Sequence, residues 1–324
     1  MKSTFGNNLI VSLFGESHGK VIGATVSGVP AGILINDELI KSLLSRRRPN
    51  NPNETKRIEK DDYEIVSGAY NGYTTGAPFT ILIKNEDIDS SKYLDGVIRP
   101  GTSDYPSYVR SDGFADLRGA GHFSGRLTAP LVAIYGILKP LLDKKNIVIS
   151  TKVDEKEYDD NDTHGFTSKI VVKGMPIGVG EPFFDSVESV LSHLLFSIPS
   201  VKGVSFGDSD ISNISGSEAK DELIYKDGKV VIMNNHNGGI NGGLTNGNDI
   251  VINVSFKPIP SIASTQNTIN IKTKENITLN IEGRHDKSIK NRVSVILESM
   301  VAIGLIDLLI SFYGSNELKW LKDV

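Results

Sequence analysis

A short glycine-bracketed stretch combines side chains that could carry out acid–base chemistry. Gly15 and Gly19 enclose a carboxylate, a hydroxyl and the imidazole of His18, between apolar runs at 9–13 and 21–29. Histidine has the side-chain pKa nearest neutral pH, so His18 suits a general acid or base. Taken alone, the pattern is more typical of a hairpin turn with an exposed histidine. The other motifs of the chain favour a functional role for His18 instead.

Arginines form the second group of candidate residues. Arg46, Arg47 and Arg48 end a predicted helix that begins at the N-cap Asn36 and stops at Pro49. A cationic last turn complements the helix dipole, but three successive arginines exceed that need. Because a planar guanidinium binds carboxylate or phosphate in a bidentate manner, the run predicts an anion site.

Two glycine-rich connections could hold a ligand against bare backbone. The first, residues 117–128, leads into an apolar helical pattern, where free N–H groups and the helix dipole favour an anion. A helix start packed closely through its glycines explains this stretch equally well. It is neither a dinucleotide-binding fingerprint nor a P-loop. The second, residues 234–247, lies between two predicted strands, which favours a bound ligand over a flexible loop.

The remaining patterns predict one α/β (α+β) domain that spans residues 1–324. Predicted strands lie at 9–13, 21–29, 63–69, 78–84, 169–173, 201–207, 230–233, 249–256, 268–271 and 276–282, and predicted helices near 37–48, 131–141, 187–195 and 292–312. Polar segments at 50–62, 85–116 and 208–228 predict long loops, and residues 315–324 a loose tail. No change in composition marks a linker.

The composition excludes several classes of protein. The chain has no cysteine, which rules out disulfides, thiolate metal sites and a cysteine nucleophile, and fits a reducing cytoplasm. Its net charge of −4 argues against non-specific nucleic-acid binding. We find no apolar run near the roughly 18 residues of a membrane span and no signal-peptide core. The six histidines lack metal-ligand spacing, so we expect no metal site.

Taken in chain order, these stretches resemble the chorismate synthase family. The matching pieces are residues 14–19, the triple arginine with Pro49, Ser67-Gly68 with 74–76, 99–101 with Asp104-Tyr105, 119–126, 197–203, 216–218, 235–243, Lys257-Pro258 and 283–286. No single piece is decisive. The ordered set spans nearly the whole chain and is therefore highly specific.

The resemblance implies a β-α-β sandwich with long active-site loops and a carbon–oxygen lyase activity. The implied reaction is the anti 1,4-elimination of phosphate from 5-enolpyruvylshikimate 3-phosphate, which gives chorismate in the shikimate pathway of aromatic amino acid biosynthesis. It requires reduced FMN without net redox change, with NADPH as a candidate reductant. The implied assembly is a cytoplasmic homotetramer whose partner is this small-molecule substrate.

The resemblance also implies roles for individual residues. His18 would protonate the leaving phosphate, and Asp286 would support proton removal at the flavin edge. The anionic substrate would be bound by Arg46, Arg47, Arg48, Arg57, Arg126 and Arg292. FMN would be held by His122, Phe123, Ser124, Gly242, Lys257, Pro258, Ile259, Pro260, Ser261 and Arg284.

The chain departs from the family pattern at several positions. Thr102 stands where many members have the histidine assigned to protonating the flavin, and His122 stands where many have an arginine. Leu127 replaces a glutamate, and the loop after Pro49 lacks an arginine often found there. We therefore expect His122 to act as a catalytic residue that partly takes over the missing donor role. The alternative is that His122 only fills the volume of the arginine.

Two other functions stay open at this point. A flavoprotein oxidoreductase could share the FMN-binding core, but it would need a hydride-donor site, and the chain has no dinucleotide fingerprint. A non-catalytic anion-binding homologue is suggested by Thr102. The presence of His18, Asp286 and the arginines argues against that second alternative.

Overall fold

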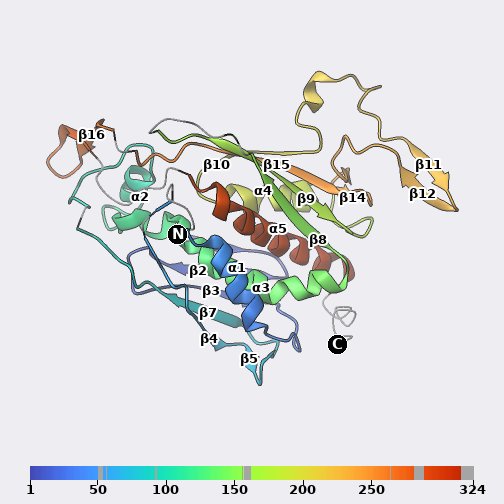
Figure 1. Ribbon diagram of the computed structural model, residues 1–324, viewed down its shortest axis with the longest axis horizontal. Coiled ribbons are helices and arrows are strands. Elements are labelled where there is room, and N and C mark those ends of the chain that lie inside the picture. The colour runs from blue at the N-terminus through green and yellow to red at the C-terminus, as the bar shows by residue number, and fades with distance from the viewer. Residues whose placement is uncertain are drawn as a thin grey trace.

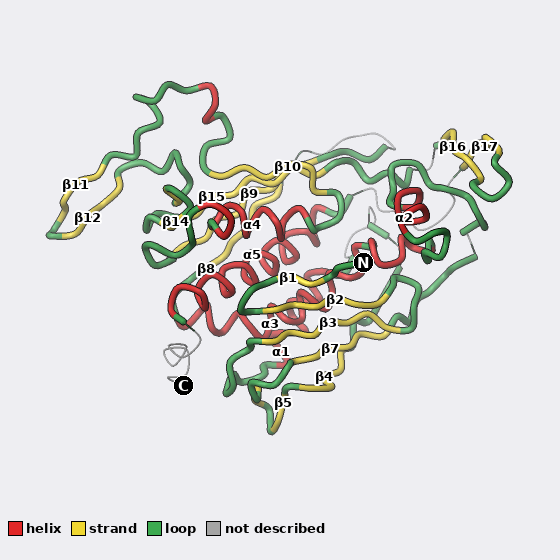
Figure 2. The backbone as a smooth tube through the Cα atoms, turned by 180° about the vertical axis from the view of Figure 1, so that it is seen from behind, coloured by secondary structure: helices red, strands yellow, loops and turns green. Residues whose placement is uncertain are grey.

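Two antiparallel sheets enclose a layer of helices (Figure 1, Figure 2). The computed structural model describes residues 1–49, 54–55, 57–91, 93–154, 156, 162–262, 264–280 and 288–314. The arrangement confirms the expected mixed α+β fold and the β-α-β sandwich.

The first sheet has five strands in the order β1-β2-β3-β7-β4. Their bounds are β1 Thr4–Phe5, β2 Ile10–Gly15, β3 Val21–Ser27, β7 Phe79–Lys84 and β4 Tyr63–Ser67. Phe79, Ile81 and Ile83 are buried, while Thr80 and Leu82 between them are less so. Since successive residues of a strand point to opposite faces, this alternation turns one face of the sheet toward the helices.

The second sheet has four strands in the order β10-β15-β9-β8. Their bounds are β10 Val201–Phe206, β15 Ile250–Phe256, β9 Phe166–Lys173 and β8 Val148–Val153. Ile250, Ile252 and Val254 of the central strand β15 are fully buried. This face closes the sandwich from the other side.

Four long helices fill the space between the sheets. They are α1 Asp37–Arg47, α3 Thr128–Lys144, α4 Val187–Phe196 and α5 Lys290–Tyr313. Helix α3 contacts the first sheet and α4 the second, and α5 contacts α1, α3, α4 and strands of the second sheet. The expected N-cap at Asn36 is confirmed, because its side chain accepts a hydrogen bond from the backbone N–H of Leu39, and Ser186 caps α4 in the same way through Ser189.

Helix α5 corrects the expectation that no apolar run could span a membrane. Judged by length and composition alone, its 24 residues could cross a membrane. However, 94% of its apolar window is buried inside the protein, as in an ordinary core helix. Asp307, near its end, is also buried and accepts hydrogen bonds of 2.7–3.2 Å from the backbone N–H groups of Asn7, Asn8 and Leu9.

Several elements were not expected from the sequence. The polar segment 85–116 contains the short helix α2 Asp104–Arg110, and strand β8 was missed. The segment 208–228 contains the unexpected strand β11 Leu223–Lys226, which forms a hairpin with β12 Lys229–Ile232, the strand predicted at 230–233; this hairpin projects from the body (Figure 1). The strands predicted at 268–271 and 276–282 are confirmed as β16 Gln266–Asn270 and β17 Glu275–Leu279.

The remaining small elements are short strands and 3₁₀ segments. The strands are β5 Ala69–Tyr70, β6 Tyr73–Thr74, β13 Ile240–Asn241 and β14 Leu244–Thr245, and the 3₁₀ segments are η1 Arg118–Phe123, η2 Gly125–Leu127, η3 Phe183–Asp185 and η4 Ile211–Asn213.

Candidate active site

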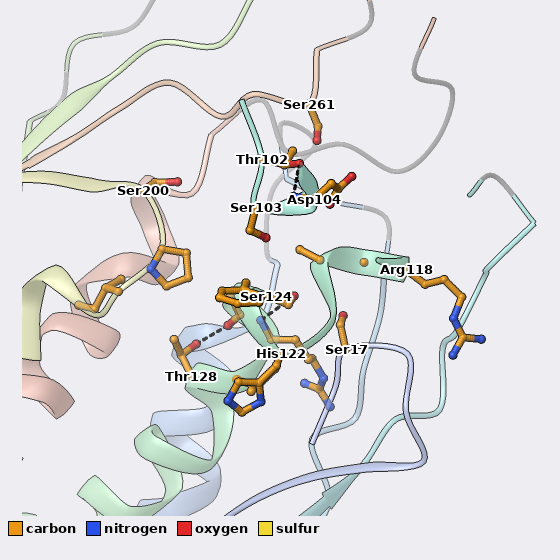
Figure 3. Close-up of a pocket in the computed structure, with 18 of the residues that line it drawn as sticks. Ser17, Thr102, Ser103, Asp104, Arg118, His122, Ser124, Thr128, Ser200 and Ser261 are labelled. Carbon is orange, nitrogen blue, oxygen red and sulfur yellow. Dashed lines mark hydrogen bonds between the residues drawn. The ribbon is translucent and has the colours of Figure 1, made fainter. Parts of the chain in front are cut away.

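A cavity of about 1530 Å³ lies where loops from both halves of the chain meet. Its lining includes the N-terminal residues 2–5, the turn that carries His18, the end of α1, the glycine-rich turn 117–128 and the segment 257–261. Figure 3 shows part of this lining, with Thr102 near Ser261 on one side and Ser124 near Thr128 on another. The cavity therefore gathers most of the residues singled out in the sequence.

His18 lies in the cavity wall and is held by two other segments, the loop that carries Ser90 and Tyr93 and the turn that carries Gly119. Its Nδ1 lies 2.8 Å from the hydroxyl of Ser90, and its ring meets that of Tyr93 edge to face at 5.2 Å. A Cβ on Gly119 would lie 2.7 Å from Nε2 of His18, and the φ of Gly119 is +58°. Glycine is thus required beside the imidazole. This environment differs from that of an exposed turn histidine.

The arginines separate into two groups. Arg47, Arg48, Arg57, Arg126 and Arg292 line the cavity, whereas Arg46 does not. The guanidinium of Arg46 instead donates two hydrogen bonds, of 2.7 and 2.8 Å, to the carboxylate of Glu298 on α5. Arg46 therefore joins α1 to α5, and its predicted contact with substrate has no geometric support.

Most guanidinium donors in the cavity are already engaged by the protein. Arg47 donates to the hydroxyl of Thr128 and to the carbonyl of Gly125, both at 2.9 Å. Arg57 donates to the hydroxyl and carbonyl of Ser17 at 2.9 Å, and to Glu59. These bonds fix the directions of the guanidinium groups before any ligand arrives.

Arg126 is buried and is enclosed by acceptors. Its Nε donates to the side chain of Asn85 at 3.0 Å, its Nη1 to Asp61, and its Nη2 to the carbonyl of Lys84 at 3.3 Å. The carboxylate of Glu59 lies 3.8 Å from Nη2. Arg126 thus contributes its charge to the cavity from a rigid position.

Arg48 differs from its neighbours. Its Nε is buried, and within the described ranges it has no hydrogen-bond partner. The nearest carboxylate oxygen, Oδ2 of Asp61, is 4.0 Å away. The Arg48 side chain as a whole is 38% exposed, the largest exposed fraction of the five predicted arginines that line the cavity, so Arg48 is the most open of them to an anionic ligand.

Positive charge exceeds negative charge in this part of the cavity. Five guanidinium groups lie near three buried carboxylates, those of Glu54, Glu59 and Asp61. Burial lowers the pKa of Arg47 to about 10, Asp61 opposes that shift, and three neighbouring arginines add to it. The cluster therefore favours a bound anion, which would relieve the repulsion among the arginines.

A second set of contacts joins the loop 99–104 to the second half of the chain. Arg99 donates to both carboxylate oxygens of Asp104 at 2.7 Å. Burial lowers the pKa of Arg99, but the contact with Asp104 outweighs burial, so the pKa is raised. The ammonium of Lys257 donates to the carbonyl of Gly101 at 2.7 Å, and a Cβ on Gly101 would lie 2.8 Å from Pro260. These contacts fix one wall of the cavity.

The predicted cofactor residues are only partly brought together. Those that line the cavity are His122, Phe123, Ser124, Lys257, Ile259, Pro260 and Ser261. Pro258 is not part of the lining, and Gly242 lies in the turn between β13 and β14, also outside it. Arg284 and Asp286 lie outside the described residues.

His122 and Thr102 both have partners within the protein. Nδ1 of His122 lies 2.8 Å from the carbonyl of Gly15, which can only accept, so Nδ1 carries a hydrogen. Nε2 lies 2.6 Å from the hydroxyl of Ser3. Thr102 donates to the carbonyl of Arg99 at 2.9 Å. The geometry favours a positioning role for His122, and its catalytic role stays a prediction.

The sequence interpretation missed the acidic half of the cluster. Glu59 and Asp61 are 6% and 3% exposed, although they belong to a segment predicted to be a surface loop. The alternation of Arg57, Glu59 and Asp61 was the available signal, because it places charges of both signs at short spacing. Among the described residues, no group of His, Asp and Glu side chains is arranged to hold a metal ion.

Comparison with known proteins agrees with the resemblance. The family model described as chorismate synthase matches residues 9–158 and 154–310. A relative named chorismate synthase from Chitinophaga pinensis is 40% identical, covering 98% of this chain and 99% of its own length. One from Korarchaeum cryptofilum is 36% identical, covering 94% and 96%. A crystal structure of chorismate synthase shares the fold, with a TM-score of 0.75 at 24% identity over 98% of this chain and 96% of that one. The chain therefore belongs to the chorismate synthase family, whose members are lyases of the shikimate pathway.

Proposed function

We propose that the enzyme eliminates phosphate from 5-enolpyruvylshikimate 3-phosphate, in the anti 1,4 sense, to give chorismate. The observation that carries this proposal is the meeting of His18 with a cation-rich cluster in one cavity. The substrate has two carboxylates and a phosphate, and the cluster has more guanidinium groups than carboxylates. Family membership supports the same reaction.

In this proposal, His18 donates a proton to the leaving phosphate. Loss of the phosphate places additional negative charge on its oxygens, and a positioned acid lowers the barrier to that step. Ser90 engages Nδ1 of His18, so Nε2 would be the donating nitrogen. Arg48 would bind an oxygen of the substrate, while Arg47 and Arg126 contribute charge from fixed positions.

The cavity lining also fits reduced FMN. Its volume of about 1530 Å³ exceeds the roughly 300–1,000 Å³ of ordinary ligand pockets, which leaves room for a second ligand. Phe123, Ile259 and Pro260 offer apolar surface for a planar ring, and Lys257 and Ser261 offer polar contacts. When bound, reduced FMN would supply electron density as phosphate leaves and would help to accept the C6 proton. Reduction by NADPH, a cytoplasmic location and a homotetramer complete the proposal and rest on the family alone.

The test measures phosphate release from the substrate with dithionite-reduced FMN and, separately, with oxidised FMN. We expect turnover only with reduced FMN. His18→Ala should lower turnover by about 10²–10⁴-fold, while His236→Ala, a histidine outside the cavity, should leave it unchanged. Equal turnover with oxidised FMN, or full activity of His18→Ala from pH 6 to 8, would contradict the proposal.

A further inference from the structure

Asp61 lies at the centre of the arginine cluster. One oxygen of its carboxylate accepts a hydrogen bond from Nη1 of Arg126. The other, Oδ2, lies 3.6 Å from Nη1 of Arg47 and 4.0 Å from Nε of Arg48. A single carboxylate therefore faces three guanidinium groups that come from two distant segments of the chain.

The surroundings of Asp61 are unusual for a residue with a purely structural role. It is 3% exposed, and its Oδ2 has no hydrogen-bond partner among the described residues. Its φ is +55°, in the left-handed region that few residues other than glycine, asparagine and aspartate adopt. Buried polar atoms without partners and strained backbone both concentrate at functional sites.

The charge of Asp61 acts against the binding of an anion, so its presence requires another explanation. A negative charge in this cluster weakens attraction for carboxylate or phosphate by simple electrostatics. In return, it fixes the direction of Arg126, whose remaining donors are held by Asn85 and Lys84. A guanidinium binds an anion well only when its planar face of donors is correctly aimed.

We propose that Asp61 is a positioning residue: it orients Arg126 and holds Arg47 and Arg48 at the spacing that the anionic substrate requires. The inference deepens the proposed function, since it takes the same substrate as its ligand. It predicts an effect opposite in sign to that of charge alone. Removing the negative charge should weaken the binding of an anion rather than strengthen it.

The experiment measures the binding of 5-enolpyruvylshikimate 3-phosphate by calorimetry, without flavin, so that catalysis does not contribute. Asp61→Asn removes the charge, and asparagine adopts positive φ readily, so the variant should fold. We expect its affinity to fall about 10- to 100-fold, the range for one hydrogen bond to a charged group. The matched control is Asp62→Asn, because Asp62 is the exposed neighbour and the change in net charge is the same.

Two further variants separate positioning from a structural role. Asp61→Glu keeps the charge but moves the carboxylate, so it should also weaken binding. On an Arg126→Gln background, Asp61→Asn should cause a smaller further loss than it does in the parent, because only Arg47 and Arg48 are then left for it to position. If both single variants at Asp61 fail to fold, the carboxylate is a folding determinant and the inference is rejected.

The remaining outcomes distinguish this inference from the proposed function. If the parent enzyme does not bind the substrate, the proposed function fails and this inference fails with it. If the parent binds the substrate and Asp61→Asn binds it as tightly or more tightly, only the role of Asp61 is wrong.

Discussion

Arg46, Arg47 and Arg48 follow one another in the sequence but contact different partners, which predicts three separable phenotypes. Replacing Arg48 by Gln should raise KM and leave stability nearly unchanged. Its side chain is 38% exposed and lines the cavity, so we expect its main contact to be with the ligand. One charge-assisted hydrogen bond is worth about 1.5–3 kcal/mol, or roughly 10- to 150-fold in KM. We expect the free energy of unfolding to change by less than about 0.5 kcal/mol.

Arg47→Gln should instead lower stability. Three hydrogen bonds from its guanidinium, to Thr128, Gly125 and Arg126, are worth about 5 kcal/mol at roughly 1.5–2 kcal/mol each. The fall of its pKa from the usual range of arginine to about 10 corresponds to about 3 kcal/mol of unfavourable charge burial, which glutamine relieves. The net loss is therefore about 2 kcal/mol.

The lowered pKa of Arg47 also determines the direction in which the free energy of unfolding changes with pH. Between about pH 10 and the higher, ordinary pKa of an arginine, the folded state releases a proton from Arg47 that the unfolded chain still holds. The free energy of unfolding of the parent should therefore rise with pH in this window relative to Arg47→Gln, and this contribution should be flat below it.

Arg46→Gln completes the series. It removes the two hydrogen bonds to Glu298, whose side chain is 9% exposed, while that of Arg46 is 41% exposed. We expect a loss of about 1–2 kcal/mol, with KM unchanged because Arg46 does not line the cavity. Stability is measured by urea unfolding and KM by phosphate release. The reasoning is refuted if Arg47→Gln raises KM more than Arg48→Gln does, or if Arg46→Gln raises KM without loss of stability.

Three further predictions concern the other contacts of the site and the fold. Gly119→Ala should reduce turnover at least tenfold, because the added Cβ would meet the ring of His18, whereas Gly125→Ala meets nothing within 4 Å and serves as its control in the same assay. His122→Ala should lower the melting temperature, because the carbonyl of Gly15 loses its donor; a loss of turnover restored by Thr102→His would instead support a catalytic role. Asp307→Asn should cost about 1.5–3 kcal/mol in urea unfolding, since three backbone N–H groups share its carboxylate; an unchanged midpoint would contradict that view of the contact.

The sequence was sufficient for the sandwich, its main strands and the capped helices. Local signals determine these elements: alternating burial along β7, the side-chain cap at Asn36 and the apolar length of α5 are all visible in short windows. Helix α2 gave no such signal because it is short and contains Pro106. Strand β8 was missed because its outward positions Ser150 and Lys152 are polar and its inward face, which includes Thr151, is only partly buried.

The sequence predicted which residue types form the site, but not which partner each residue contacts. Successive residues of a helix point about 100° apart, so Arg46, Arg47 and Arg48 had to face different directions. Which direction meets α5, the glycine-rich turn or the cavity depends on how α1 docks, and no local pattern encodes that. The burial of Asp61 likewise depends on cations supplied by residues far away in the sequence.

The bond between Asp307 and the loop at residues 7–9 has a consequence for the order of events during synthesis. The N-terminal strand leaves the ribosome first, yet its anchor is made almost 300 residues later. Residues 2–5 form part of the cavity wall, so that wall cannot be fixed until α5 has emerged and docked. A nascent chain that lacks its last helix would expose the apolar face of the second sheet at β8 and β9 and the faces of α1, α3 and α4 that α5 covers, which makes such an intermediate prone to aggregation. We expect the folding of the whole chain and the formation of the cavity to be a single late event, after α5 has emerged.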